Sequence, residues 1–178
     1  MTSVDPQYHR KLETRLSAFD GRATTILGEM EAELQQDRSY HSSLIDLAGS
    51  NDNNVSSRAT WLMKSALEKG KSFSPEQVDQ ILGVLGKITI WDAQLHICQS
   101  VQYLSFGRQQ AKLMVSWLRK LVDHKRPFLR AWSLDALIRI GLDFPDLVEA
   151  NELIIAAGND PAASVRARAR KLSKGAGL

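Results

Sequence analysis

The side chains best suited to catalysis or metal binding are few in this 178-residue chain, and their spacing is unfavourable. The four histidines are His9, His41, His96 and His124. No two of them lie three to five residues apart, as the ligands of a zinc site usually do. His96 and Cys98 are two residues apart, which points them to different faces of a helix. We therefore expect no metal site and no cofactor.

Two further catalytic patterns are incomplete. Gly70-Lys71-Ser72 matches the end of a phosphate-binding loop, but Ser65 replaces the required earlier glycine and no strand precedes it. Gly70 is better explained as the residue that ends a helix. The Gly-x-Ser-x-Gly pattern of serine hydrolases does not occur in the sequence. These observations predict a protein that is not an enzyme.

Helix signals recur along the whole chain, whereas the alternation typical of strands is missing. Capping residues stand shortly before prolines, which fit the first turn of a helix. These capping residues are Asp5, Ser74, Asp143 and Asp160. Glycines that favour helix ends are Gly49, Gly70, Gly107, Gly141 and Gly158. The predicted helices span residues 5–19, 21–37, 40–49, 54–69, 75–87, 90–105, 108–123, 127–141, 145–157 and 161–174.

The sequence repeats with a period of 36 residues. This step separates Arg166, Arg130, Gln94, Arg58 and Arg22. It also separates the apolar residues Ile45, Ile81, Trp117 and Leu153. Because one helical pair cannot bury both of its apolar faces, neighbouring pairs must stack. We expect a single domain over residues 1–178, with two-helix units at roughly 1–37, 38–70, 71–106, 107–142 and 143–174.

Two segments resemble HEAT repeats. Residues 128–141 are similar to the second helix of such a repeat, and residues 160–166 are similar to the turn that leads into it. The resemblance implies an all-α fold, a short right-handed α-α superhelix (α-solenoid) of about five repeats. It also implies a structural ladder between adjacent repeats, formed by an arginine and by an aspartate of the turn six residues before it. The aligned residues are Asp52, Arg58, Arg130, Asp160 and Arg166, with His124 in the aspartate position before Arg130.

The row of arginines has a second interpretation. Basic residues gather at 119–130 and 166–174, and no acidic residue follows Asp160. An aligned row of guanidinium groups could follow a nucleic-acid backbone. In the structural alternative, the same arginines bind turn aspartates and helix ends, and the basic C-terminal segment is a solvated helix. The sequence leaves both interpretations open.

A polar and aromatic stripe on the second helices is the candidate binding site. Residues three or four apart share a helix face, and equivalent helices of stacked repeats lie side by side. The stripe comprises His96, Gln99, Tyr103, Trp132, Asp135, Arg139 and Arg168, and Lys171 follows on the last helix. Trp, Tyr and Arg contribute strongly to binding at interfaces. The leading hypothesis is a scaffold or adaptor that binds a protein or peptide on the concave surface of the solenoid.

Nucleic-acid binding is the alternative hypothesis. Bacterial alkylpurine DNA glycosylases use short HEAT-like arrays whose cleft contains Trp, Asp and Arg. Trp132, Asp135 and Arg168 resemble this set, although the family's full catalytic set is not matched. HEAT-like bilin lyases or their chaperones are a third possibility. The apolar repeat position of Cys98 does not favour this third possibility, because it predicts that Cys98 lies in the core. We expect Trp117 in the core as well.

The composition favours a cytoplasmic protein without membrane contact. The single cysteine cannot form an internal disulfide, which suits a reducing compartment. Residues 1–15 are polar and carry charges of both signs, unlike a secretory signal. No apolar stretch approaches the roughly 20 residues that a membrane-spanning helix needs.

Overall fold

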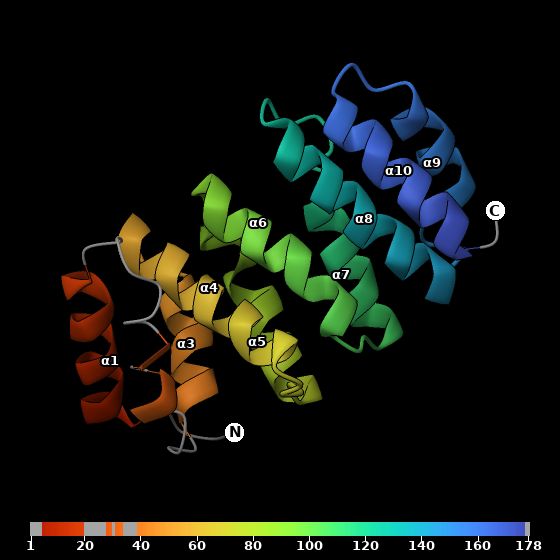
Figure 1. Ribbon diagram of the computed structural model, residues 1–178. Helices are drawn as coiled ribbons and strands as arrows, with labels where there is room; N and C mark the ends of the chain where they lie inside the picture. The colour runs from red at the N-terminus through yellow and green to blue at the C-terminus, as the bar shows by residue number, and fades with distance from the viewer. Residues whose placement is uncertain (1–4, 20–27, 30, 34–38, 177–178) are drawn as a thin grey trace. The chain divides into compact units, whose positions relative to one another are not determined.

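Every regular element in the described part of the protein is helical (Figure 1). The computed structural model describes residues 5–19, 28–29, 31–33 and 39–176, and no strand occurs among them. The predicted all-α class is therefore confirmed. The chain divides into two compact units, residues 1–96 and residues 97–178. None of the described helices is both long enough and apolar enough to cross a membrane.

The N-terminal unit is built around helix α3, which packs against α1, α4 and α5. Its elements are α1 (Pro6–Ala18), α3 (Tyr40–Ala48), α4 (Asn53–Glu68), α5 (Pro75–Val84), the 3-10 turn η1 (Leu85–Lys87) and the first part of α6 (Trp91–Ser100). Helix α3 suits its central position because seven of its nine residues are buried. The helix predicted over 21–37 lies mostly outside the described residues, of which 28–29 and 31–33 are helical.

The C-terminal unit is built around helix α8, which packs against α7, α9, α10 and η2. Its elements after α6 are η2 (Val101–Tyr103), α7 (Arg108–Leu118), α8 (Pro127–Asp143), α9 (Ala150–Gly158) and α10 (Ala163–Ala176). Ten of the seventeen residues of α8 are buried, so most of its circumference faces neighbouring elements. Helices α8 and α10 lie side by side (Figure 1).

The apolar rows of the 36-residue repeat point into the core. Ile45 and Ile81 are each 1% exposed and Trp117 is 9% exposed, while Leu153 is half-buried against the core of the C-terminal unit. Cys98 is also buried, and burial raises the pKa of its thiol. The predicted core positions of Trp117 and Cys98 are therefore confirmed.

Side-chain caps start helices at Asp5 and Ser74 as predicted, whereas Asp143 is the last residue of α8 and the predicted cap there is wrong. The carboxylate of Asp5 accepts a hydrogen bond from the backbone N–H of Gln7 at 2.9 Å. Ser74 accepts from the backbone N–H of Gln77 at 3.3 Å, and the Gln77 side chain accepts from the Ser74 N–H at 3.0 Å. Gly70 follows α4 with φ of +85°, a conformation that side chains with a Cβ disfavour.

The predicted boundary between α8 and α9 is wrong. Helix α8 runs through Gly141 to Asp143, and α9 begins at Ala150, not at residue 145. Gly141 serves close packing instead of ending the helix. A Cβ built on it would lie only 2.8 Å from the carbonyl oxygen of Val148. The glycine therefore allows the connection to α9 to pass directly against α8.

Other helix ends differ by a few residues. The predicted helices 75–87 and 90–105 each consist of an α-helix followed by a 3-10 turn, which tightens the last turn. Helix α7 ends at Leu118 and not at residue 123, and α10 begins at Ala163. Gly107 is the N-cap of α7 and does not end the preceding helix.

Replacing Gly141 by alanine should lower the free energy of unfolding by about 1–3 kcal/mol, because the new methyl group would press on the backbone of Val148. Gly83 in α5 is the matched control, since nothing lies within 4 Å of a Cβ built there. Gly83→Ala should raise stability by about 0.5–1 kcal/mol, as alanine is preferred over glycine in helices. Urea denaturation followed by circular dichroism measures both changes. A Gly141→Ala protein as stable as the parent would contradict this role.

Candidate functional site

A repeated hydrogen bond closes the turns before helices α6, α8 and α10. In each case, a side chain of the 36-residue row donates to the backbone carbonyl of the residue six positions earlier. The contacts are Gln94 Nε2 to Ile88 O (3.1 Å), Arg130 Nη1 to His124 O (2.9 Å) and Arg166 Nη1 to Asp160 O (2.8 Å). Carbonyls in such turns have no helical partner and need another donor. The repeated bond therefore fixes where each of these helices begins.

In this bond each side chain pairs with the backbone carbonyl six residues earlier and not with a carboxylate there, whereas the predicted ladder between adjacent two-helix units is present at Arg130 and Asp160. The acceptor is the backbone, which is the same for every residue type. His124 and Ile88 can therefore occupy the turn position as well as Asp160 does. The spacing of six residues was visible in the sequence. Within one turn the acceptor is the backbone carbonyl, and the Asp160 side chain accepts from Arg130 of the preceding two-helix unit instead.

Arg58 and Asp52, which were predicted to pair, have other partners. The Asp52 carboxylate caps α4 by accepting from the backbone N–H of Asn54 at 2.8 Å. Arg58 donates to the carbonyl of Leu16 at the end of α1. Its guanidinium carbon also lies 5.2 Å from the centroid of the Phe19 ring. Arg58 therefore joins α4 to α1 instead of closing its own turn.

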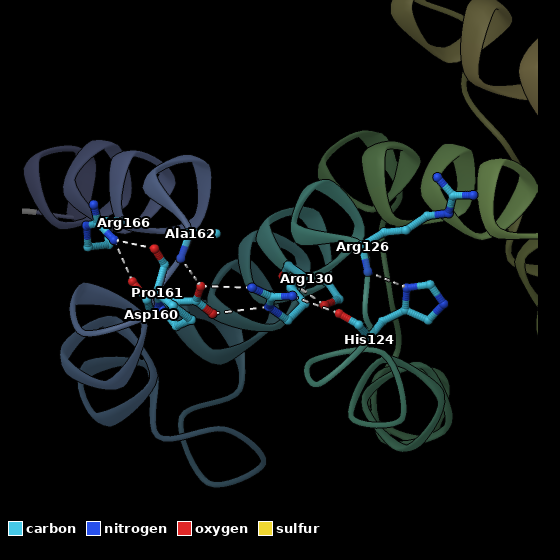
Figure 2. Close-up of polar contacts among 8 residues, drawn as sticks. His124, Arg126, Arg130, Asp160, Pro161, Ala162 and Arg166 are labelled. Carbon is cyan, nitrogen blue, oxygen red and sulfur yellow. Dashed lines mark hydrogen bonds and ion pairs between the residues drawn. The ribbon is translucent and has the colours of Figure 1, made fainter.

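Asp160 links α8 to the turn before α10 (Figure 2). Its carboxylate accepts from Arg130 Nε at 3.1 Å and Nη2 at 2.9 Å, and from the Ala162 N–H at 2.7 Å. The side chains of Arg130 and Asp160 are only 14% and 16% exposed, so solvent screens the pair weakly. The hydrogen bonds from Arg130 lower the pKa of Asp160, and the same bonds raise the pKa of Arg130.

Asp160→Asn should destabilise the C-terminal unit at neutral pH and reduce the dependence of its stability on pH. Because the pKa of Asp160 is lower in the folded than in the unfolded protein, the carboxylate stabilises the fold above the unfolded pKa of about 3.9. This contribution is lost as the pH falls through the folded pKa. At pH 7 the loss should be about 1–3 kcal/mol, typical of hydrogen bonds to charged groups. In urea denaturation, the difference between parent and variant should shrink from pH 7 to about pH 3.

Asp146→Asn is the matched control for this prediction. Asp146 forms an ion pair with Arg108 in which both side chains are more than half exposed. Solvent weakens such pairs, so this substitution should change stability much less than Asp160→Asn does. Equal effects of the two substitutions would contradict the importance of the shielded position of Asp160.

Asp135 lies in the middle of the predicted binding stripe but inside the protein. Its side chain is 1% exposed, which corrects the expectation that it contacts a partner directly. Its carboxylate oxygens accept from Arg139 Nε at 2.6 Å and from Arg168 Nη1 at 3.3 Å. One buried carboxylate thus holds a guanidinium group from α8 and another from α10. Asp135 positions the two arginines that remain partly exposed.

Trp132 and Arg168 form part of a groove between α8 and α10. The guanidinium carbon of Arg168 lies 3.6 Å from the centroid of a Trp132 ring, a close cation–π contact. The groove has a volume of about 350 Å³. Its lining residues are Phe128, Ala131, Trp132, Ser164, Ala167, Arg168 and Lys171. Phe128 is 52% exposed and Lys171 is exposed, so aromatic and cationic groups face solvent together.

A smaller pocket of about 220 Å³ lies at the C-terminal end of α8. Its lining is mostly apolar and comprises Val101, Gln102, Leu104, Phe106, Arg139, Ile140, Leu142, Asp143 and Phe144. Leu142 is 54% exposed, and Tyr103 of the adjoining turn η2 is 42% exposed. Arg139 belongs both to this pocket and to the contacts of Asp135, so the buried carboxylate supports both ends of the surface.

His96 and Gln99 are less accessible than the stripe requires. His96 belongs to the N-terminal unit, whereas the other six residues of the stripe belong to the C-terminal unit. Its Nδ1 lies 3.1 Å from Thr60 Oγ1, and burial lowers its pKa to about 4, so the ring is neutral at pH 7. The Gln99 side chain is half-buried. Tyr103 is 42% exposed, and the side chain of Arg139 is 39% exposed.

The stripe omitted Phe128 and Leu142, which line the two pockets. Phe128, Trp132, Arg139 and Leu142 are spaced so that they share one face of α8. This spacing was a signal that could have identified both residues. Apolar residues at helical spacing are usually buried, however, and the sequence does not show that these two stay exposed.

No group of histidine, cysteine, aspartate and glutamate side chains in the described part of the chain is arranged to hold a metal ion. Comparisons of the chain with protein-family models, with curated proteins and with solved structures find no significant match. What the protein binds must therefore be inferred from its own residues.

Asp135→Ala should lower the free energy of unfolding of the C-terminal unit by about 3–5 kcal/mol, because it removes one partner of a buried ion pair. Asp143→Ala is the matched control on the same helix. Asp143 is exposed at the C-terminus of α8, where a negative charge is unfavourable, so its removal should leave stability unchanged or slightly increased. Urea denaturation measures both variants, and a neutral Asp135→Ala would contradict the supporting role of this carboxylate.

Proposed function

We propose that the chain is a non-enzymatic helical repeat protein that binds a protein or peptide along the exposed side of α8. The supporting observation is the groove at Phe128, Trp132 and Arg168, where aromatic rings and a fixed guanidinium remain accessible. Aromatic and arginine side chains provide much of the binding energy at protein interfaces. Because Asp135 already holds Arg168 in place, little side-chain entropy is lost when a ligand binds.

The scaffold in this proposal is a HEAT-like α-solenoid whose helical pairs stack with the 36-residue period in a right-handed superhelix. Three of the expected pairs pack together, α3 with α4, α7 with α8, and α9 with α10. Solenoids commonly bind ligands through equivalent helices that line their concave surface. In this arrangement, α8 and α10 are second helices of their pairs. The proposed role is that of a cytoplasmic scaffold or adaptor.

The internal contacts of the arginine row support the structural interpretation of these residues. Arg130 and Arg166 donate to turn carbonyls, and Arg58 donates to the end of α1. Their guanidinium groups are half-buried and already engaged. A row that follows a phosphate backbone would need accessible guanidinium groups.

Nucleic-acid binding is the second candidate, and the exposed cations of α10 favour it. These cations are Arg170, Lys171 and Lys174. Base-repair chemistry of the glycosylase type is disfavoured, because a catalytic carboxylate must reach the substrate. The Asp135 carboxylate is 1% exposed and occupied by two arginines. The second candidate is therefore binding without chemistry.

Trp132→Ala and Arg139→Ala should each weaken the binding of peptides selected against the intact protein about tenfold, since each removes an interface anchor. The peptides come from a random display library, and fluorescence anisotropy measures their affinities. Leu113→Ala is the matched control, because Leu113 is 51% exposed on α7 and lines neither pocket. Trp132→Phe should retain most of the affinity. It keeps an aromatic ring and removes an indole N–H that has no hydrogen-bond partner among the described residues.

Circular dichroism shows whether each variant remains helical. Affinities that stay unchanged in helical Trp132→Ala and Arg139→Ala proteins would overturn this site. A salt titration with a labelled DNA duplex separates the second candidate, because phosphate contacts make log K fall steeply with log salt. Absence of DNA binding at low ionic strength would remove that candidate.

A further inference from the structure

We infer that the ligand of the α8 surface is an extended, acidic peptide segment of a partner protein, with an apolar side chain near each end. This inference rests on the proposed function and specifies the chemistry of its partner. Two pockets, each with a large exposed apolar side chain, and the excess of positive charge on and between them carry it.

The two pockets set the length of the segment. Phe128 lines the groove beside α10, and Leu142 lines the pocket at the other end of α8. With a rise of 1.5 Å per residue, fourteen helical steps place these residues about 21 Å apart. An extended peptide advances about 3.3 Å per residue and covers this distance with about six residues.

Both ends of the surface accept apolar side chains. Phe128 and Leu142 are 52% and 54% exposed although both are large and apolar. Phe106 and Phe144 add aromatic surface to the pocket at Leu142, and Trp132 adds it to the groove. Burying such side chains against a ligand removes apolar area from water, which favours binding.

The surface between the pockets carries a surplus of positive charge. Asp135 supplies one negative charge and holds two guanidinium groups, those of Arg139 and Arg168. Lys171 adds a third cation beside Arg168, and no ion pair within the described part of the chain includes it. A ligand carboxylate placed here faces three cations and one buried anion. Charge complementarity therefore selects an acidic segment.

The distribution of charge also places the acidic residues within the segment. Asp143 lines the pocket beside Leu142 and offsets the positive charge at that end. The other cations, Arg168 and Lys171, lie at the groove with Phe128. The ligand's carboxylates therefore belong near its centre and toward the Phe128 end, while the residue at Leu142 is apolar and its neighbours are uncharged.

A peptide fits this surface better than a nucleic acid does. Two of the three cations share the Asp135 carboxylate, which lowers their attraction for a phosphate backbone. Each end of the surface also presents a large exposed apolar side chain, Phe128 or Leu142, which suits an aliphatic or aromatic group of a peptide. Nucleic-acid binding is therefore an outcome that the experiment must detect separately.

The experiment begins with the tightest peptide that a random display library yields against the intact protein. This peptide should contain acidic residues between two apolar residues separated by about six positions. Two derivatives replace its central acidic residues by glutamine or by lysine. The glutamine form should bind about fivefold more weakly, and the lysine form more weakly still, because each step removes or reverses the attraction of the three cations.

A charge reversal on the protein tests the same contact from the other side. Lys171→Glu should weaken the binding of the acidic peptide about tenfold and strengthen the binding of the lysine form. Lys112→Glu on α7 is the matched control, since Lys112 is exposed and lines neither pocket. Lys112→Glu should leave the affinities of all three peptide forms unchanged.

Removal of each anchor tests the two-pocket arrangement. Phe128→Ala and Leu142→Ala should each weaken the binding of the acidic peptide about fivefold or more. In a further peptide, serine replaces the apolar residue that occupies one pocket. The affinity of this peptide should no longer respond to the alanine substitution in that pocket. It should still respond to the alanine substitution in the other pocket. Leu113→Ala again serves as the control for loss of an exposed apolar side chain.

The outcomes separate this inference from the proposed function. If the selected peptides lack acidic residues, or if the three forms bind equally, the inference is overturned. The proposed function still stands in that case, provided that Trp132→Ala weakens binding. If no selected peptide responds to Trp132→Ala, both are overturned. A DNA duplex that competes with the acidic peptide, binds more tightly and depends on Lys171 would assign the surface to nucleic acid.

Discussion

The turns before α6, α8 and α10 depend on one kind of hydrogen bond, from a long side chain to the carbonyl six residues earlier. Folding removes water from these carbonyls, so without this donor they would have no hydrogen bond in place of the ones lost to water. The bond ties the first turns of each helix to the turn that precedes it. At Asp160 a second contact is added, because the carboxylate of the same turn binds Arg130 of α8.

The position of the candidate binding surface follows from one buried anion in α8. A carboxylate that is 1% exposed is unfavourable unless cations and hydrogen bonds compensate its lost hydration. Asp135 obtains this compensation from Arg139 and Arg168, which reach it from α8 and α10. The two arginines are held at the surface as a result, one over Trp132 and the other beside the pocket at Leu142. The same ion pairs thus stabilise the helix contact and preorganise the surface.

The arginines of this protein have two separate roles. Those of the 36-residue row, such as Arg130 and Arg166, are occupied with turns and support the scaffold. Those of the stripe, Arg139 and Arg168, are held by Asp135 but keep a partly exposed edge. Open grooves with fixed aromatic and cationic groups suit the side chains of a peptide. A small molecule would need a more enclosed site to bury most of its surface.

The sequence by itself determined the helical class, the caps at Asp5 and Ser74 and the rows that form the core, because these depend on nearby residues and on the helical period. Ser74, Trp117 and Cys98 lie as predicted for this reason. Only the tertiary structure decided that Asp135 is buried, that Leu142 stays exposed and that Arg130 and Arg166 bind the backbone carbonyls of their own turns. Burial and partner choice depend on contacts between distant segments. Arg168, for example, reaches Asp135 across thirty-three residues of sequence, and no local pattern records that contact.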